Sequence, residues 1–217
     1  MKRNAGKAAA HATGGRHRVT TGKRAGRLTT RVGVGAVILA VAILIASAFT
    51  PGYDHRYDTI SRLASPGQPW AWLVRSGLVV FGAAALSAAI TPPRSGANHP
   101  RAIRRLIALA GAAAIVAGIA PKDPPDVPAT AISQLHVAAA VVGVAAIFTG
   151  MVLTAATGPQ RTDRRWSAAA AAVVVIAGAA FPLAWGTAVY GILQRIILLT
   201  TLAWLVGAAN RLDQLKV

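Results

Sequence analysis

The sequence predicts an all-α membrane protein, a polytopic bundle of six transmembrane helices with both chain ends in the cytoplasm. Of its 217 residues 54% are hydrophobic and only 13% are charged, whereas about a quarter of the residues in soluble domains carry charge. Six apolar stretches approach the roughly 20 residues that a helix needs to cross a hydrocarbon core of about 30 Å. Basic residues concentrate in alternate gaps between these stretches, which is typical of membrane topology.

The chain begins with a basic segment, residues 1–31, that contains nine of the 23 Lys and Arg and no acidic residue. Its apolar content is too low to compensate the entropy of ordering, so we predict a disordered cytoplasmic tail. Attraction to anionic lipid is worth about 1 kcal/mol per basic side chain near a membrane and accounts for this composition. The basic residues form no face of a folded domain, so the sequence predicts no nucleic-acid partner.

The transmembrane domain is predicted to span residues 32–210, followed by a short cytoplasmic tail at 211–217. Pro and Gly mark the gaps between the helices, as expected of helix breakers. A gap of only three residues, 186–188, separates the last two helices and predicts a close antiparallel hairpin. The predicted helices are 32–49, 70–90, 103–120, 132–156, 166–185 and 189–209.

The first apolar stretch has an alternative interpretation as a signal peptide, because Ala46, Ser47 and Ala48 have the form of a cleavage site. Cleavage would leave five helices. The 31-residue basic region and an apolar run longer than the usual signal core of about 7 to 15 residues favour an uncleaved helix.

Orientation follows from the positive-inside rule, under which loops rich in Lys and Arg stay cytoplasmic. The side that holds the chain ends carries 18 basic residues, and the opposite side carries 5. The chain ends are therefore predicted to lie inside the cell, most simply at the cytoplasmic membrane of a bacterium.

Small residues predict where the helices pack. Gly111 and Gly118 lie seven residues apart in the third predicted helix, and Gly143 and Gly150 lie seven apart in the fourth. Each pair therefore falls on one helix face. The alanine run 168–172 offers the fifth helix a similar surface of small residues. Such faces allow close backbone approach inside a membrane.

Ionisable side chains inside a membrane are costly and usually face the bundle interior or a watery cavity. Arg75, His136 and Arg195 all lie a few residues inside helices that start at the outer surface, and they therefore share one depth. Four of the six acidic residues belong to the two outer loops and could pair with the arginines: Asp54, Asp58, Asp123 and Asp126.

These positions predict a polar pocket at the outer leaflet. Its expected ligand-binding residues are Asp58, Arg75, Asp123, His136 and Arg195. In an alternative interpretation, both arginines extend along their helices to place the charged head at the interface. The inner halves of the predicted helices offer scattered Thr and Ser and no acid, so a path for ions across the whole bilayer is not expected.

An enzyme is a second possibility, with His136 as a general base and Asp58, Ser61 or Asp123 as partners. No strained nucleophile turn accompanies Ser61. We expect no cofactor and no metal, because haem would require a second histidine at matching depth, zinc lacks a third ligand, and the chain has no cysteine.

Three motifs resemble one known family. The first is Asp58-Thr59-Ile60-Ser61 with Leu63 and Pro66-Gly67. The second runs from Ala120-Pro121-Lys122-Asp123 through Pro125 to Leu135-His136, and the third is Gly191-Ile192-Leu193-Gln194-Arg195.

In order and helix context these motifs are similar to the bacterial and archaeal membrane family known as domain of unknown function 998, over about residues 34–212. The resemblance implies a six-helix bundle and no particular activity. It also implies that the polar positions of the three motifs are characteristic of the family, namely Asp58, Ser61, Asp123, His136 and Arg195.

The leading hypothesis is thus a membrane protein whose outer-leaflet pocket binds or moves a lipid or other small amphiphile. The alternatives are a membrane-embedded, hydrolase-like enzyme that uses His136 with Asp or Ser, and a structural or assembly subunit of a membrane complex. Membrane lipid is the expected partner, and the sequence sets no oligomeric state.

Overall fold

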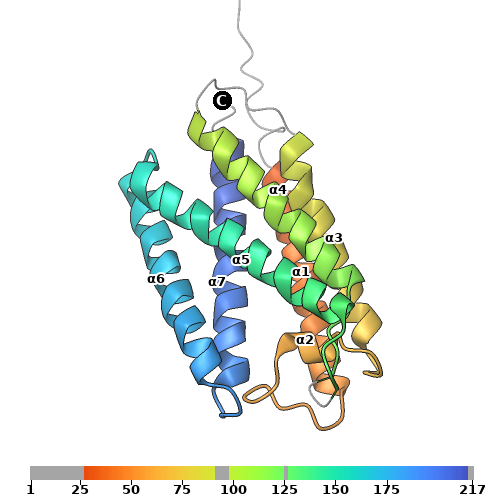
Figure 1. The fold of residues 1–217 in the computed structure, drawn as a ribbon. Helices are drawn as coiled ribbons and strands as arrows, with labels where there is room; N and C mark the ends of the chain where they lie inside the picture. Colours follow the sequence, from red (N-terminus) through yellow and green to blue (C-terminus); the bar gives the residue numbers. More distant parts are fainter. Residues whose placement is uncertain (1–26, 91–97, 125–126, 215–217) are drawn as a thin grey trace, which may run out of the picture.

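The computed structural model describes residues 27–90, 98–124 and 127–214. All regular structure in these ranges is helical, and six of the helices are long and apolar enough to cross a membrane, which confirms the predicted fold class. Figure 1 shows the helices as α1 (Arg27–Phe49), α2 (Ile60–Leu63), α3 (Ala71–Ile90), α4 (Asn98–Ile119), α5 (Ala131–Thr157), α6 (Arg161–Leu183) and α7 (Tyr190–Gln214).

The helices extend beyond their predicted ends on the side of the chain termini. α1 begins at Arg27 rather than at residue 32, α6 begins at Arg161 rather than at 166, and α7 continues to Gln214 rather than to 209. Counting apolar residues finds only the part of a helix that lies in hydrocarbon, whereas backbone hydrogen bonding continues through the polar residues that follow. The rest of the predicted tail, residues 1–26, lies outside the described residues, as do residues 215–217.

The six spanning helices pack as a ring. Each contacts two neighbours, in the order α1, α3, α4, α5, α6, α7 and back to α1, and α7 also reaches α5 and α4. Large apolar side chains such as Val37, Leu44, Val141 and Ile176 lie exposed on the outside. An exterior of this kind is stable against lipid tails and would be costly in water.

Glycines make the contact between α3 and α4 close. A Cβ atom on Gly111 would lie 2.6 Å from the carbonyl oxygen of Gly82, and one on Gly118 would lie 2.8 Å from that of Arg75. Both predicted glycines of α4 therefore face α3. Gly143 of α5 lies against Ala113 of α4.

One aromatic side chain fills the space between α5, α6 and α7. Trp204 is 1% exposed, and its Nε1–H donates to the Ser167 hydroxyl of α6 at 3.0 Å. Gly150 of α5 leaves room for the ring, since a Cβ there would lie 2.8 Å from Trp204 Cη2. The buried indole thus keeps its polar atom satisfied while it packs the three helices together.

The bundle has two distinct ends in Figure 1. We call the end with the start of α1 and the finish of α7 the termini end. At the opposite end, the loop end, lie residues 50–70, which include α2, and residues 120–124, 127–130 and 184–189. The connection between α6 and α7 turns at Gly186, whose φ of 76° is in the left-handed region that favours glycine.

Candidate functional site

The residues predicted to form the outer pocket lie at the loop end, where hydrogen bonds divide them into two sets. Arg195, Asp58 and Ser61 belong to the contacts between residues 50–70, which we call the first loop, and α7. Arg75, Asp123 and His136 belong to the contacts around the end of α4 and the start of α5. The acid Asp126 lies outside the described residues.

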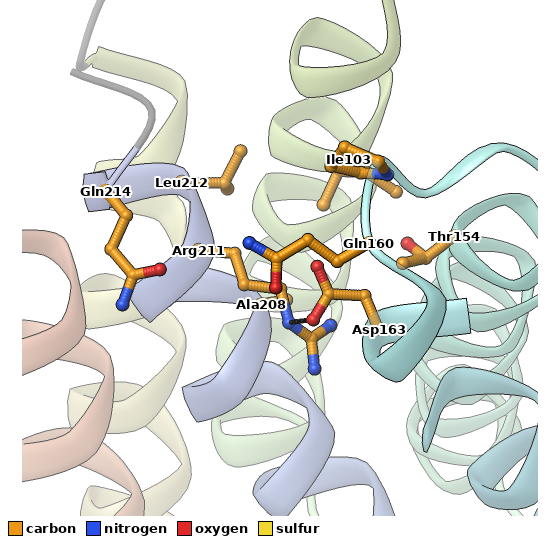
Figure 2. Close-up of a pocket in the computed structure, with 9 residues that line it drawn as sticks. Ile103, Thr154, Gln160, Asp163, Ala208, Arg211, Leu212 and Gln214 are labelled. Atoms are coloured by element: carbon orange, nitrogen blue, oxygen red, sulfur yellow. Dashed lines mark ion pairs between the residues drawn. The ribbon is translucent and has the colours of Figure 1, made fainter. Parts of the chain in front are cut away.

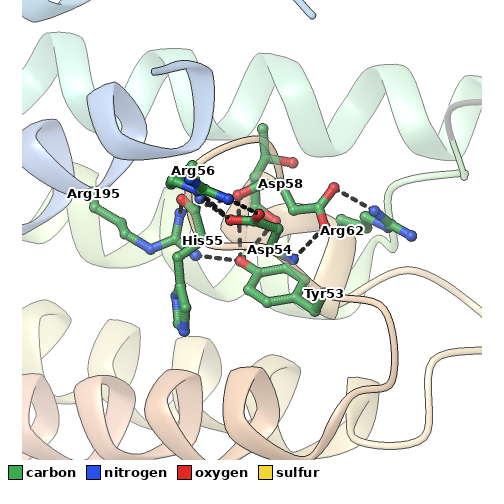
Figure 3. A network of polar contacts seen from close by, with 8 residues as sticks. Tyr53, Asp54, His55, Arg56, Asp58, Arg62 and Arg195 are labelled. Carbon is green, nitrogen blue, oxygen red and sulfur yellow. Dashed lines mark hydrogen bonds and ion pairs between the residues drawn. The ribbon is translucent and has the colours of Figure 1, made fainter. Parts of the chain in front are cut away.

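Arg195 holds the first loop on the start of α7 (Figure 3). Its Nη1 donates to the carbonyl oxygens of His55 at 2.7 Å, Asp58 at 3.0 Å and Gly191 at 2.8 Å. Its Nη2 donates to the Tyr53 hydroxyl, and the guanidinium lies 5.6 Å from the centre of the Tyr53 ring. A planar guanidinium can bind several acceptors that lie in fixed directions, so this side chain connects the loop at three separate residues.

Two neighbours of Arg195 on α7 complete this attachment. The side-chain oxygen of Gln194 accepts a hydrogen bond from the backbone N–H of Ile60, and its Nε2 donates to the Ser61 hydroxyl at 3.3 Å. The N–H of Gly191 donates to the Arg56 carbonyl at 2.7 Å. Gly191 carries no side chain here because a Cβ would overlap the carbonyl oxygens of His55 and Asp58.

The acids of the first loop bind within that loop rather than to Arg195. The Asp58 carboxylate accepts from the Asp54 N–H at 2.9 Å and pairs with Arg62. Asp54 pairs with Arg56 at 3.0 Å, and hydrogen bonding from Arg56 holds the pKa of the Asp54 carboxyl below its ordinary value. Burial raises the pKa of the Tyr53 hydroxyl. The expected carboxylate partner of Arg195 is therefore replaced by carbonyl oxygens and a phenol.

Arg75 and His136 bind the four successive carbonyl groups at the end of α4. Nδ1 of His136 lies 2.9 Å from the Ala117 oxygen and 2.8 Å from the Ala120 oxygen. A carbonyl cannot donate, so Nδ1 carries the proton. Arg75 donates from Nε to the Gly118 oxygen at 3.0 Å and from Nη2 to the Ile119 oxygen at 2.8 Å. The last carbonyls of a helix lack partners within the helix, and these two side chains supply them.

Asp123 fixes the loop that follows. Its carboxylate accepts from the Thr130 N–H at 2.7 Å, and its own N–H donates to the Ser133 hydroxyl at 3.1 Å. The hydrogen bond from Thr130 lowers the pKa of the Asp123 carboxyl. Thr130 caps α5 by accepting from the Ser133 N–H. Asp123 thus stabilises a loop and contacts neither Arg75 nor His136 through a hydrogen bond among the described residues.

These contacts do not assemble the hydrolase-like arrangement. Within the described ranges no hydrogen bond joins His136 to Ser61 or to an aspartate; its Nδ1 is directed to backbone oxygens, and Ser61 bonds to Gln194. The same ranges contain no group of three or more His, Cys, Asp or Glu arranged to hold a metal ion.

A cavity of about 220 Å³ lies at the opposite, termini end of the bundle. Figure 2 shows side chains from α4, α5, the connection to α6, α6 itself and α7 around it. Its lining mixes apolar and polar groups: Ile103, Thr154, Pro159, Gln160, Asp163, Ala208, Arg211, Leu212 and Gln214.

An ion pair lies in the wall of this cavity. The Asp163 carboxylate of α6 accepts from Nε of Arg211 of α7 at 2.8 Å, and Asp163 is 9% exposed. Nη1 of Arg211 is buried and has no hydrogen-bond partner among the described residues. The pair therefore joins α6 to α7 and leaves the Nη1 group of Arg211 without an acceptor among the described residues.

More buried charge lies around the ion pair. Asp213 of α7 is 1% exposed and accepts from both the N–H and the hydroxyl of Thr29, which connects α7 to α1 at 2.9 and 3.0 Å. Arg104 of α4 is 5% exposed and interacts electrostatically with Asp213.

Sequence reasoning missed these groups because Asp163 and Asp213 lie outside the predicted helix limits, although both belong to helices in the structure. The predicted helices themselves contain no acid, and the two acids lie in the turns by which α6 and α7 extend beyond them. One signal was available, since Asp163 and Asp213 are the two acids that stand in otherwise basic segments.

Comparison with known proteins gives one match. A family described as "Protein of unknown function (DUF998)" matches residues 33–211, a range that includes the loop-end contacts and the cavity lining up to Arg211. Searches of curated proteins and of solved structures found no match.

Proposed function

The chain belongs to the DUF998 family and is a multi-pass membrane protein, and from that premise we propose that it binds a lipid or other small amphiphile. The observation that carries this proposal is the cavity at the termini end, whose lining combines apolar and polar side chains. Ile103, Ala208 and Leu212 can contact methylene groups, while Thr154 and Gln160 can hydrogen-bond a head group.

The size of the cavity limits what it can hold. Pockets that enclose a drug-sized molecule measure about 300 to 1,000 Å³, and this cavity measures about 220 Å³. It therefore accommodates a head group and the first carbons of a chain, with the remainder of the chain in the bilayer. The charge bias of the sequence predicts that this end faces the cytoplasm, and on that prediction the ligand would come from the inner leaflet.

This site differs from the one that the sequence predicts. At the loop end the donors of Arg75 and Arg195 already bind protein carbonyls, and a ligand would have to displace them. Ligand binding at Asp58, Arg75, Asp123, His136 and Arg195 remains a prediction, and the experiment below includes it.

A structural or assembly role is the second candidate. The loop-end hydrogen bonds favour it, because they attach the described loop segments to the ends of α4, α5 and α7. The hydrolase-like alternative has weaker support, since His136 and Ser61 have separate partners.

Native mass spectrometry of the full chain purified with co-extracted lipid tests the proposal. Gln160 lies exposed in the lining and its side chain makes no cap hydrogen bond, so Gln160→Trp should fill the cavity entrance without unfolding the helix. We expect bound lipid to fall by about tenfold. Gln134→Trp, at an exposed glutamine of the loop end, is the matched control and should retain lipid.

The opposite pattern would contradict the cavity as the site. If Gln160→Trp retains its lipid while Arg195→Lys loses it, the ligand lies at the loop end as the sequence predicts. If neither variant changes the bound lipid and the wild-type protein carries none, the structural role is the better explanation.

A further inference from the structure

We infer that the cavity selects an anionic, phosphate-bearing lipid head group and that the guanidinium of Arg211 binds it. This inference rests on the proposed function and names the chemical class of its ligand. Three features of the termini end carry it: an unused buried donor, acids that already have partners, and a strong excess of positive charge.

The first feature is the unused donor of Arg211. Its Nε is occupied by the Asp163 carboxylate at 2.8 Å, while the buried Nη1 has no hydrogen-bond partner among the described residues. Arginine does not lose its proton in proteins, so this group stays a donor at every physiological pH. A buried donor without an acceptor is unfavourable. Because Arg211 lines the cavity, a turn of its guanidinium would bring this donor to a phosphate oxygen there and remove that penalty.

The second feature is that the nearby acids have partners. Asp163 binds Arg211, and Asp213 accepts two hydrogen bonds from Thr29 and interacts with Arg104. Neither carboxylate therefore requires a cationic group of a ligand. Asp163 has a positioning role instead, because it fixes the guanidinium in the cavity wall by the Nε contact.

The third feature is the charge around the cavity. Exposed arginines on the described helices of the termini end add positive potential that attracts anions: Arg101, Arg105, Arg161, Arg164 and Arg165. The cavity lining contributes the amides of Gln160 and Gln214 as further donors. A phosphate ester matches this donor set better than a zwitterionic head group, whose cationic part would meet the arginines.

The test measures lipid binding to the detergent-purified full chain by native mass spectrometry with added phosphatidylglycerol or phosphatidylcholine. We expect phosphatidylglycerol to bind about tenfold more tightly to the wild type, and Arg211→Gln to remove about that factor for the anionic lipid alone. Arg31→Gln is the matched control, because it removes the same charge from an exposed position of α1 at the same end, away from the cavity lining. It should change binding less than about twofold.

A second variant separates ligand binding from structural support. Asp163→Asn removes the negative charge beside the guanidinium but keeps a side-chain oxygen that can accept from Arg211 Nε and hold the guanidinium in place. Phosphatidylglycerol affinity should therefore be equal or higher, in the opposite direction to Arg211→Gln. A merely structural ion pair predicts equal losses from both variants, and that result would overturn the inference. Equal losses from Arg31→Gln and Arg211→Gln would overturn it too, since general surface charge would then explain the binding.

The remaining outcomes distinguish this inference from the proposed function. If both lipids bind equally and Gln160→Trp blocks both, the amphiphile site stands and the anionic selectivity is wrong. If Gln160→Trp blocks neither, the site itself is wrong. If inorganic phosphate displaces phosphatidylglycerol at equal concentration, the cavity takes a free anion, and the assignment to lipid fails.

Discussion

At the residue scale, the polar side chains of the loop end act mainly on backbone groups. Arg195 binds three carbonyl oxygens of the first loop and its own helix, and Arg75 and His136 bind four at the end of α4. The last carbonyl groups of α4 have no partner within the helix, so a missing side chain would leave them without their protein donors. These residues, which the sequence predicts as ligand-binding groups from their depth in the membrane, therefore have a structural role.

Arg195→Lys tests this use. A lysine ammonium keeps the charge but lacks the planar fork, so it cannot reach the carbonyls of His55 and Asp58 and the Tyr53 hydroxyl together. We expect the free energy of unfolding to fall by about 2 kcal/mol, the worth of one or two hydrogen bonds to a charged group. Thermal melting in detergent and protease cleavage within residues 50–62 would measure it.

Arg56→Lys is the control for that experiment, because the Arg56 side chain is 64% exposed and forms a surface pair with Asp54. It should leave the melting temperature nearly unchanged, since exposed pairs contribute little. Equal melting temperatures for the Arg195 variant and the wild type would show that the first loop is held by other contacts.

At the scale of elements, glycines decide which helices lie in closest contact. The predicted glycine faces of α4 and α5 do face neighbouring helices, and Gly82 of α3 completes the contact between α3 and α4. Lipid tails are as apolar as the helix surfaces, so association depends on close van der Waals contact rather than on the hydrophobic effect. The contact between α3 and α4 is therefore sensitive to a single methyl group.

Gly111→Ala is the corresponding prediction. The new Cβ would lie 2.6 Å from the Gly82 oxygen and 2.6 Å from the Leu86 nitrogen, both of them backbone atoms that cannot move aside. We expect the two helices to separate and the free energy of unfolding to fall by about 1 to 3 kcal/mol, as in overpacked cores. Melting in detergent gives the value.

Gly178→Ala supplies the matched control, because a Cβ at this position of α6 meets nothing within 4 Å. Alanine is the better helix former, so this variant should be neutral or slightly stabilised. A stable Gly111 variant alongside it would mean that α3 and α4 can adjust without cost.

At the scale of the whole molecule, the ring of six helices brings distant parts of the sequence together at two ends. The termini end joins α4, α6 and α7 around the cavity and α1 to α7 through Asp213. The loop end joins the first loop to α7. Which end faces the cytoplasm decides which leaflet supplies the proposed ligand.

The topology can be tested directly because the chain contains no cysteine. A membrane-impermeant maleimide should label Arg56→Cys, at the loop end, in intact cells. It should label Arg161→Cys, at the termini end, only after the membrane is permeabilised. The reverse pattern would place the chain ends outside and assign the cavity to the outer leaflet.

The sequence by itself determined the fold class and the approximate spans, because a bilayer requires about 20 apolar residues per helix wherever the chain crosses it. It also indicated which glycines pack against neighbours and which polar residues lie at the loop end. The contact between Gly111 and Gly82 could not be predicted, because the sequence does not show which face α3 turns toward α4.

Only the tertiary structure decided the partners and the cavity. Arg195 binds carbonyl oxygens rather than a carboxylate because the first loop folds its backbone onto α7. Asp163 and Arg211 are 48 residues apart and become a buried pair only where α6 and α7 pack side by side. Hydropathy is a property of each helix by itself and can be read from the sequence. A site depends on which helices become neighbours, and that is decided by the packing between helices.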